Sequence, residues 1–277
     1  MTIKESDLVT GAEMTWCPGC NNFMLLSAVK KAIKNVSVDK GLDRKDFSMA
    51  AGIGCHGKMF DYLNVGGVYN LHGRVLPTMI GTKIGNPSLE VIGFGGDGDT
   101  YSEGVSHFIH ASRFNPDMTM VVHNNKVFAL TTGQATPTSE KGFKSKAQPK
   151  GHTEPALNPL ELAIANNTSF VARVDPKKFG KTVEVLEKAM KWEGFSYIDV
   201  IMSCKKYSQE MDMLNEKSYW MEEERRTKEK ALKKAAEWNE KEKLPLGIFY
   251  MEKKETMSDR KDSLSSLKDE NKGWFQT

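Results

Sequence analysis

The chain of 277 residues contains no apolar run long enough to cross a membrane, which takes roughly 18–20 residues. Its opening segment, MTIKESDLVTGAEMTW, lacks the apolar stretch of a secretory signal. The chain as a whole also lacks a strong excess of positive or negative charge. The net charge is +3, and no basic stripe carries interleaved aromatic residues. We therefore expect a cytoplasmic protein that binds neither membranes nor nucleic acid.

Cysteine is scarce, with only Cys17, Cys20, Cys55 and Cys204 in the chain. A reducing compartment argues against structural disulfides. Four thiolates complete either one tetrahedral zinc site or one iron–sulfur cluster, with none to spare. The WCPGC segment looks like a redox-active dithiol, but it follows a polar tail where such a dithiol follows a core strand. Spacing alone leaves zinc and a [4Fe–4S] cluster open, because one close pair and two single cysteines fit either.

What the sequence does contain is an alternation of helical and strand-like periodicity. Strands connected by crossover helices form a parallel sheet, so we expect a doubly wound α/β domain with a mostly parallel sheet over residues 1–205. Residues 137–159 read as a long loop, whose length is typical of functional segments. The predicted helices cover about 21–34, 75–84, 102–113, 160–166 and 176–192, and the predicted strands about 47–52, 89–94, 118–123, 169–174 and 195–201.

Residues 206–277 are rich in Glu and Lys and form, in this interpretation, a charged and partly helical C-terminal extension. An amphipathic helix or two is predicted over 208–243, with Trp220, Leu232 and Trp238 as its large apolar anchors. A charged helical arm of this kind packs across its own domain or across a partner.

The GDGD segment at 96–99 lies where a predicted strand ends and a helix begins. Ligands of open α/β sheets bind at such carboxyl ends, and a helix N-terminus favours phosphate. The next strand ends in His123, Asn124 and Asn125, which a parallel sheet brings to the same edge. The carboxylate of Asp97, the amide oxygen of Asn125 and the carbonyl of Val127 are hard oxygen ligands of the kind that Mg²⁺ prefers. GDG followed by NN at this interval resembles the thiamine diphosphate fingerprint.

Several segments together resemble the β subunit of the 2-oxoacid:ferredoxin oxidoreductases. They are TWCPGCNN, GIGCHGK, LHGRVLPTMIGTKIGNPSLEVIGFGGDGD, HNNKVFALTTGQATPTS and FSYIDVIMSC, and the later KLPLGIFY is similar to that family's C-terminal region. They occur in the family's order over about two thirds of the chain. One departure is that Cys204 follows Met-Ser, where relatives often have proline before the cysteine.

The resemblance implies a thiamine diphosphate-binding fold and the oxidative decarboxylation of a 2-oxo acid with coenzyme A to acyl-CoA and CO₂, in either direction. Electrons would pass through one [4Fe–4S] cluster to ferredoxin. The glutamate that activates thiamine diphosphate would come from a separate α subunit, so that the isolated chain would be inactive.

The resemblance also assigns residues. The cluster ligands would be Cys17, Cys20, Cys55 and Cys204, and the Mg²⁺ ligands Asp97, Asn125 and the Val127 carbonyl. The residues expected around thiamine diphosphate are Ile53, Gly54, Cys55, His56, Gly96, Asp97, Gly98, Asp99, Asn125, Val127, Ala129 and Leu130, with His72 beside them.

Substrate choice is expected to involve Lys58, which follows Cys55 and would pair with the second carboxylate of 2-oxoglutarate. Together with the HGR segment, this favours 2-oxoglutarate over pyruvate. The loop lysines Lys141, Lys144, Lys146 and Lys150 are candidates for contacts with coenzyme A phosphates, although the preferred interpretation is simply an exposed basic loop. Two alternatives stay open at this point: a thiamine-dependent decarboxylase without a redox centre, and a zinc-stabilised α/β interaction module.

Overall fold

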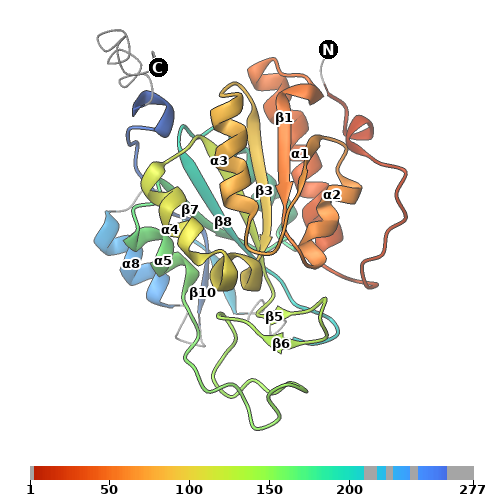
Figure 1. The fold of residues 1–277 in the computed structure, drawn as a ribbon. Coiled ribbons are helices and arrows are strands. Elements are labelled where there is room, and N and C mark those ends of the chain that lie inside the picture. Colours follow the sequence, from red (N-terminus) through yellow and green to blue (C-terminus); the bar gives the residue numbers. More distant parts are fainter. Residues whose placement is uncertain (1–2, 209–216, 223–226, 238–242, 261–277) are drawn as a thin grey trace, which may run out of the picture.

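The computed structural model describes residues 3–208, 217–222, 227–237 and 243–260. Within these ranges, eight strands form one sheet in the order β2-β1-β3-β4-β8-β7-β10-β9 (Figure 1). Neighbouring strands are parallel, except that β10 runs antiparallel to β7. In sheet order, the strands are β2 (Gly66–Tyr69), β1 (Phe47–Ala51), β3 (Glu90–Gly96), β4 (Met118–Asn124), β8 (Phe195–Ile201), β7 (Phe170–Val174), β10 (Leu244–Met251) and β9 (Ser218–Trp220).

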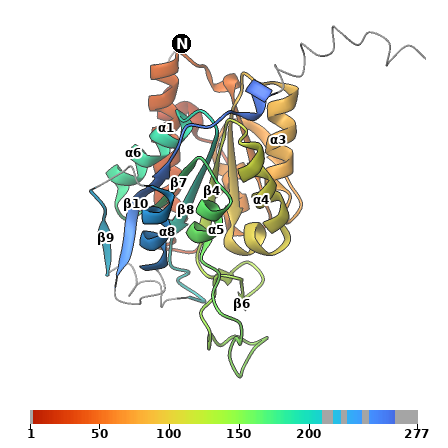
Figure 2. The same ribbon diagram turned by 90° about the vertical axis from the view of Figure 1, so that its left-hand side faces the viewer.

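Helices cover both faces of the sheet, so the molecule has three layers (Figure 2). One face carries α1 (Asn22–Lys40), α2 (Met59–Tyr62) and α6 (Phe179–Met190). The other carries α3 (Val75–Gly85), α4 (Val105–Phe114), α5 (Pro159–Ala165) and α8 (Lys228–Ala236). This confirms the predicted doubly wound α/β architecture and each of the five predicted helices, four of which connect strands.

The central strands are mostly apolar because each is buried on both faces. In β3, Ile92 and Phe94 point into the core beneath α1 and α6, whereas Val91 points into the core beneath α3 and α4. Successive side chains of β8 divide in the same way, with Ile198 on the first side and Tyr197 on the second. A strand side chain alternates between faces at every residue, so both layers of helices are needed to cover them.

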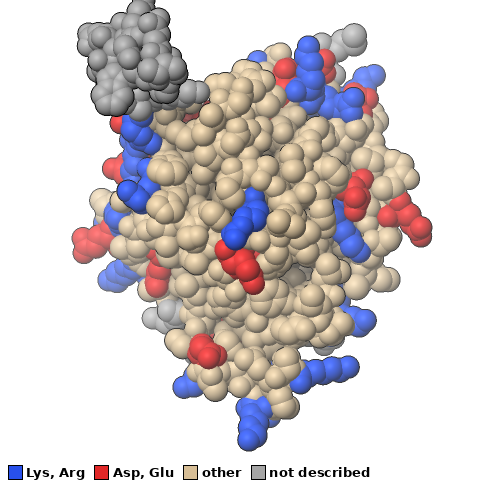
Figure 3. Space-filling model, viewed as in Figure 1, with Lys and Arg blue, Asp and Glu red and all other residues tan. Residues whose placement is uncertain are grey.

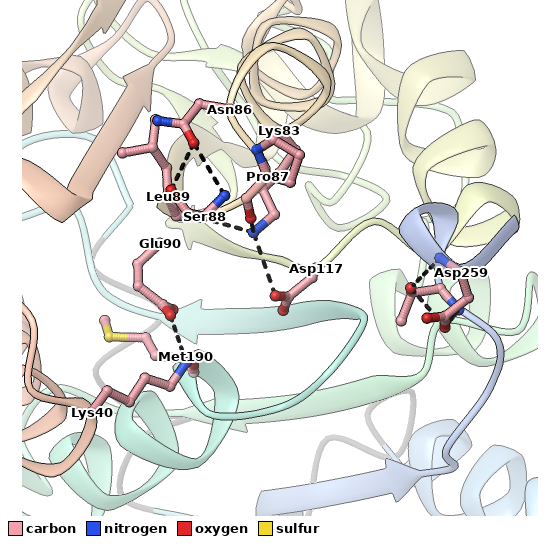
Figure 4. Close-up of polar contacts among 11 residues, drawn as sticks. Lys40, Lys83, Asn86, Pro87, Ser88, Leu89, Glu90, Asp117, Met190 and Asp259 are labelled. Atoms are coloured by element: carbon pink, nitrogen blue, oxygen red, sulfur yellow. Dashed lines mark hydrogen bonds and ion pairs between the residues drawn. The ribbon is translucent and has the colours of Figure 1, made fainter. Parts of the chain in front are cut away.

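The amino ends of the strands are held by a buried lysine (Figure 4). Lys83 of α3 is 5% exposed. Its Nζ donates to the carbonyl oxygens of Pro87 (2.8 Å) and Leu89 (2.9 Å) and lies 3.4 Å from Asp117 Oδ2. These three oxygens offset the cost of burying the charge, and they fix the turn that leads from α3 into β3.

The C-terminal segment differs from its expectation. A helix is present at α8, but Trp220, predicted as a helical anchor, lies in strand β9, and Leu244–Met251 form β10. Tyr and Trp favour strands, and pairing of β9 with β10 outweighs the helical propensity of the surrounding Glu and Lys. Leu232 lies on α8 as predicted, whereas Trp238 is outside the described residues.

Candidate functional site

The carboxyl ends of β1, β3, β4 and β8 meet at one edge of the sheet, the lower edge in Figure 1. A cavity with about 520 Å³ of empty space opens there. Every residue predicted to surround the cofactor lines it, His72 included. Sequence reasoning missed five further lining residues: Asn22, His123, Phe128, Thr131 and Met202.

Asp97 is the buried carboxylate of this cavity, with 2% of its surface exposed. Its Oδ2 accepts hydrogen bonds from the hydroxyls of Thr136 (2.5 Å) and Thr138 (2.8 Å). Burial raises the Asp97 pKa to about 6, against the opposing effect of these two hydroxyls. Ionising a carboxylate that is buried in this way is costly unless a cation binds next to it. Asp97 is therefore a suitable ligand for a divalent metal, which prefers carboxylate oxygens.

The two threonines reach Asp97 because the chain reverses after β4. A short hairpin of β5 (Val127–Phe128) and β6 (Gln134–Ala135) returns the chain to the sheet edge. The turn between β4 and β5 contains Lys126 in the left-handed backbone conformation, with a φ of 59°. Asn125 Oδ1 accepts a hydrogen bond from the Val127 amide at 3.1 Å, so two of the three ligands predicted for Mg²⁺ lie on one tight turn.

A chain of polar contacts connects Asp97 to the protein core. The same Thr138 hydroxyl lies 3.1 Å from Asn124 Oδ1 and shares its single hydrogen between Asp97 and Asn124, and Asn124 Nδ2 donates to Asp199 Oδ1 (3.0 Å). Asp199 Oδ2 accepts from Arg173 Nε at 2.8 Å, and both members of that ion pair are fully buried. A buried pair of this kind fixes geometry more than it adds stability. The network therefore holds the carboxyl ends of β3 and β4 in one arrangement.

Three side chains of the same cavity carry buried polar atoms that no described protein atom satisfies. They are His56 Nε2, Asp99 Oδ2 and His123 Nε2. Burial, together with the neighbouring His56, lowers the His123 pKa well below its usual value. His123 Nδ1 donates to Asn22 Oδ1 at 2.8 Å, which leaves Nε2 as the acceptor. Buried groups of this kind mark a cavity built for a polar ligand.

Asp99 begins a π-helical turn (Asp99–Glu103) directly after β3. Such turns are common at functional sites. Asp99 Oδ1 accepts a hydrogen bond from the Gly73 amide at 2.7 Å. At the other end of the turn, Glu103 Oε2 lies 2.8 Å from His72 Nδ1. Gly98 is required by close packing, because a Cβ there would overlap the Phe128 ring.

The four cysteines line a second cavity, with about 880 Å³ of empty space, which shares Cys55 with the first. Cys17 and Cys20 enter it on a turn in which Cys20 N donates to Cys17 O (3.0 Å). Gly19 has a φ of 73° at the third position of this turn, and proline precedes it, as in a type II turn.

Trp16 holds this turn against Cys55, a role the sequence did not reveal. Its Nε1 donates to the Cys55 carbonyl at 2.7 Å, and its ring packs edge-on against Tyr62 and Phe23. The indole is 6% exposed. The only sign of this role in the sequence was an aromatic residue immediately before the CxxC pair.

Burial raises the pKa of the Cys20 and Cys55 thiols, that of Cys55 to about 11. The neighbouring cysteines raise both further, which means that the four sulfurs influence one another electrostatically. Four thiolates that repel one another are unfavourable without positive charge among them, and iron or zinc would supply that charge.

Lys58 lies at the second cavity. Its Nζ donates to the Thr15 hydroxyl (2.6 Å) and carbonyl (3.2 Å).

The predicted long loop is confirmed: Leu157 N donates to Pro137 O and closes its base. Basic side chains project from the lower end of the molecule in Figure 3, where this loop lies. Its four exposed lysines are Lys141, Lys144, Lys146 and Lys150.

In the part of the chain that is described, no helix is both long and apolar enough to cross a bilayer.

Comparison with known proteins agrees with this geometry. Residues 52–200 match the family described as thiamine pyrophosphate enzyme, C-terminal TPP binding domain. Residues 200–266 match the family described as the C terminal of the pyruvate ferredoxin oxidoreductase beta subunit. The second match covers the strand β10 that the sequence left unassigned.

Two curated relatives and one solved structure extend the match. The chain is 42% identical over 252 residues to the 2-oxoacid:ferredoxin oxidoreductase subunit beta of Saccharolobus solfataricus, covering 85% of this chain and 81% of the relative. It is 38% identical to the 2-oxoglutarate synthase subunit KorB of Archaeoglobus fulgidus, over 68% of this chain and 69% of the relative.

The solved structure is a 2-oxoglutarate:ferredoxin oxidoreductase from Magnetococcus marinus with 2-oxoglutarate, coenzyme A and succinyl-CoA bound. It superposes with a TM-score of 0.90 at 28% identity, covering 99% of this chain and 93% of that chain. The chain therefore belongs to the β subunits of the 2-oxoacid:ferredoxin oxidoreductases, a family of oxidoreductases, and contains their thiamine diphosphate-binding domain.

Proposed function

We propose that this chain binds thiamine diphosphate with Mg²⁺ in the first cavity and one [4Fe–4S] cluster in the second. Together with an α subunit, it would oxidise 2-oxoglutarate with coenzyme A to succinyl-CoA and CO₂ and reduce ferredoxin. The observation that carries the proposal is that the two cavities adjoin and share Cys55, with oxygen donors in one and four thiols in the other.

In the first cavity, Asp97, Asn125 and the Val127 carbonyl would hold Mg²⁺. The raised pKa of the buried Asp97 supports this, because a divalent cation would compensate the charge. The polar atoms of His56, Asp99 and His123 are available to the ligand. When bound, thiamine diphosphate supplies the electron sink that lets a 2-oxo acid lose CO₂. The protein's part is to orient the cofactor and keep water from it.

In the second cavity, Cys17, Cys20, Cys55 and Cys204 would hold the cluster. Zinc requires four sulfurs within about 2.3 Å of a single point. Here the four thiols line one cavity together, with two of them from a close pair and two from separate strand ends, an arrangement that a cluster also accommodates. Membership in an oxidoreductase family favours the cluster over a structural zinc site or a non-redox decarboxylase.

For the substrate, the relatives named for 2-oxoglutarate support that acid over pyruvate. Lys58 is the candidate partner of its second carboxylate. The ammonium now contacts neutral oxygens of Thr15 and would exchange them for a carboxylate on binding. The lysines of the loop at 137–157 are candidates for the phosphates of coenzyme A.

An α subunit is required in this proposal, because none of the described residues that line the first cavity is a glutamate. Large apolar side chains lie exposed on and after the edge strand β2. They are Val68 (47%), Tyr69 (44%) and Leu71 (77%). Exposed apolar groups on an edge strand are typical of surfaces that a partner covers.

The test combines the purified chain with its α subunit under anaerobic conditions. We expect reduction of ferredoxin that depends on 2-oxoglutarate and coenzyme A, with a lower kcat/KM for pyruvate. The chain alone should show no turnover. Activity of the chain without a partner, or a complex that reduces no ferredoxin, would contradict the proposal.

A further inference from the structure

The lining of the second cavity is strongly asymmetric in charge. Besides the four cysteines, it includes Lys58, Lys205 and Lys206, whereas no Asp or Glu of the described ranges lines it. Across the whole chain, Lys and Arg outnumber Asp and Glu by only 39 to 36. Among the residues that the structure describes, the charged side chains at this cavity are therefore all basic.

Two of these lysines are displayed on a closed turn directly after Cys204. The Ser208 amide donates to the Cys204 carbonyl at 3.0 Å, and this hydrogen bond closes the turn formed by residues 204–208. Lys205 and Lys206 at the tip are exposed. The turn is anchored at its base, because the Met202 amide donates to the Asn124 carbonyl at 3.0 Å.

The far side of the turn is also fixed. The Tyr207 ring lies against Gly133, where an added Cβ would come within 2.9 Å of the tyrosine Cδ1. Lys206 Nζ lies 5.5 Å from the centre of the same ring, a cation–π distance. A backbone held in this way presents its charges at a constant position, which is what an electrostatic docking surface requires.

The cavity is also open toward solvent at a cysteine, because Cys17 is exposed. From these observations we infer that Lys205 and Lys206 form the docking surface for the electron carrier, an acidic iron–sulfur protein. The inference rests on the proposed cluster in this cavity. We define the carrier-docking turn as residues 204–208.

The chemistry at this surface is one electron transferred at a time. The carrier would gain one electron and the proposed cluster would lose one, with no bond made or broken. Two such transfers account for the two electrons released with each CO₂. Contacts between redox partners are small and short-lived, so charge governs their rate of association more than buried area does.

The experiment uses the complete α–β complex with Lys205→Glu and Lys206→Glu together. The matched control reverses an adjacent basic pair at the opposite edge of the sheet, Arg44→Glu with Lys45→Glu, which are both exposed. Reduction of an acidic ferredoxin is compared with reduction of a small uncharged quinone, at several salt concentrations.

We expect kcat/KM for the ferredoxin to fall by about 10-fold or more at low salt in the Lys205 and Lys206 variant, with a flatter salt dependence. Quinone reduction and the control variant should stay within about twofold of wild type, because neither depends on steering by the turn. If charge reversal disturbs the cluster, Lys205→Gln with Lys206→Gln removes the charges alone and should lower kcat/KM roughly threefold.

An unchanged kcat/KM for ferredoxin in both lysine variants would overturn the docking surface, and so would an equal loss in the control. These outcomes leave the proposed function intact, because the wild-type complex still reduces ferredoxin. A wild-type complex that reduces neither acceptor would overturn the proposed function, and the docking surface with it.

Discussion

Replacing Asp97 by asparagine should stabilise the chain that lacks metal and cofactor while abolishing their binding. The carboxylate is buried, and its pKa lies near 6 against an ordinary value of 3.8. That difference corresponds to about 3 kcal/mol, at about 1.4 kcal/mol for each unit of pKa. Asparagine has nearly the same shape, and its amide oxygen can accept from Thr136 and Thr138. Its NH₂ group cannot replace the oxygen that accepts from the Asn125 backbone, so about 3 kcal/mol is the upper limit of the gain. The neutral side chain avoids the cost of ionisation.

The sign of the pH dependence follows from the raised pKa. Because the folded chain binds the Asp97 proton more tightly than the unfolded chain, the group's contribution to stability is full below about pH 4. It is lost as the pH rises through about 6. The variant has no such group, so its advantage should be absent near pH 4 and reach up to about 3 kcal/mol at pH 7.

The assay is urea unfolding of the full chain without metal at pH 4.5, 6 and 7.5, paired with calorimetric titration of thiamine diphosphate in Mg²⁺. Asp61→Asn is the control, because Asp61 is exposed. Its unfolding free energy should change by less than about 0.5 kcal/mol. The reasoning is refuted if Asp97→Asn is less stable than wild type at pH 7.5, or if it still binds thiamine diphosphate with wild-type affinity.

Two further substitutions test the support of the site and its substrate. Thr138→Val removes the hydroxyl that lies within hydrogen-bond distance of both Asp97 and Asn124. It should cost about 2 kcal/mol or more of unfolding free energy and weaken Mg²⁺-dependent thiamine diphosphate binding by about 10-fold, by calorimetry. Thr182→Val, a buried control away from the cavity, should lower stability without changing that affinity. Lys58→Ala should lower kcat/KM for 2-oxoglutarate relative to pyruvate by roughly 10-fold, and an unchanged ratio in steady-state kinetics would contradict the assignment.

The sequence was sufficient to predict the sheet edge at which Asp97 and Asn125 meet. Both follow apolar strands, and parallel strands place their carboxyl ends together. The same rule does not extend to Thr136 and Thr138. They reach Asp97 through a hairpin of two-residue strands whose reversal depends on an unusual backbone conformation at Lys126. Hairpins this short leave no periodicity to read.

The C-terminal region shows a second limit of sequence reasoning. Its Glu and Lys content favours helix, and α8 is one. Trp220 lies in a strand because β10 offers it a partner, and that pairing comes from long-range contacts. The segment KLPLGIFY carried the relevant signal, since Ile248, Phe249 and Tyr250 are strand-favouring residues.

The most direct test of the proposed pair of cofactors is an EPR spectrum of the anaerobically purified chain after reduction with dithionite, together with its metal content. The account predicts a low-temperature signal from a reduced [4Fe–4S] cluster and about four irons per chain. A colourless, EPR-silent sample that contains one zinc per chain would contradict the electron-transfer role and leave only the thiamine diphosphate site.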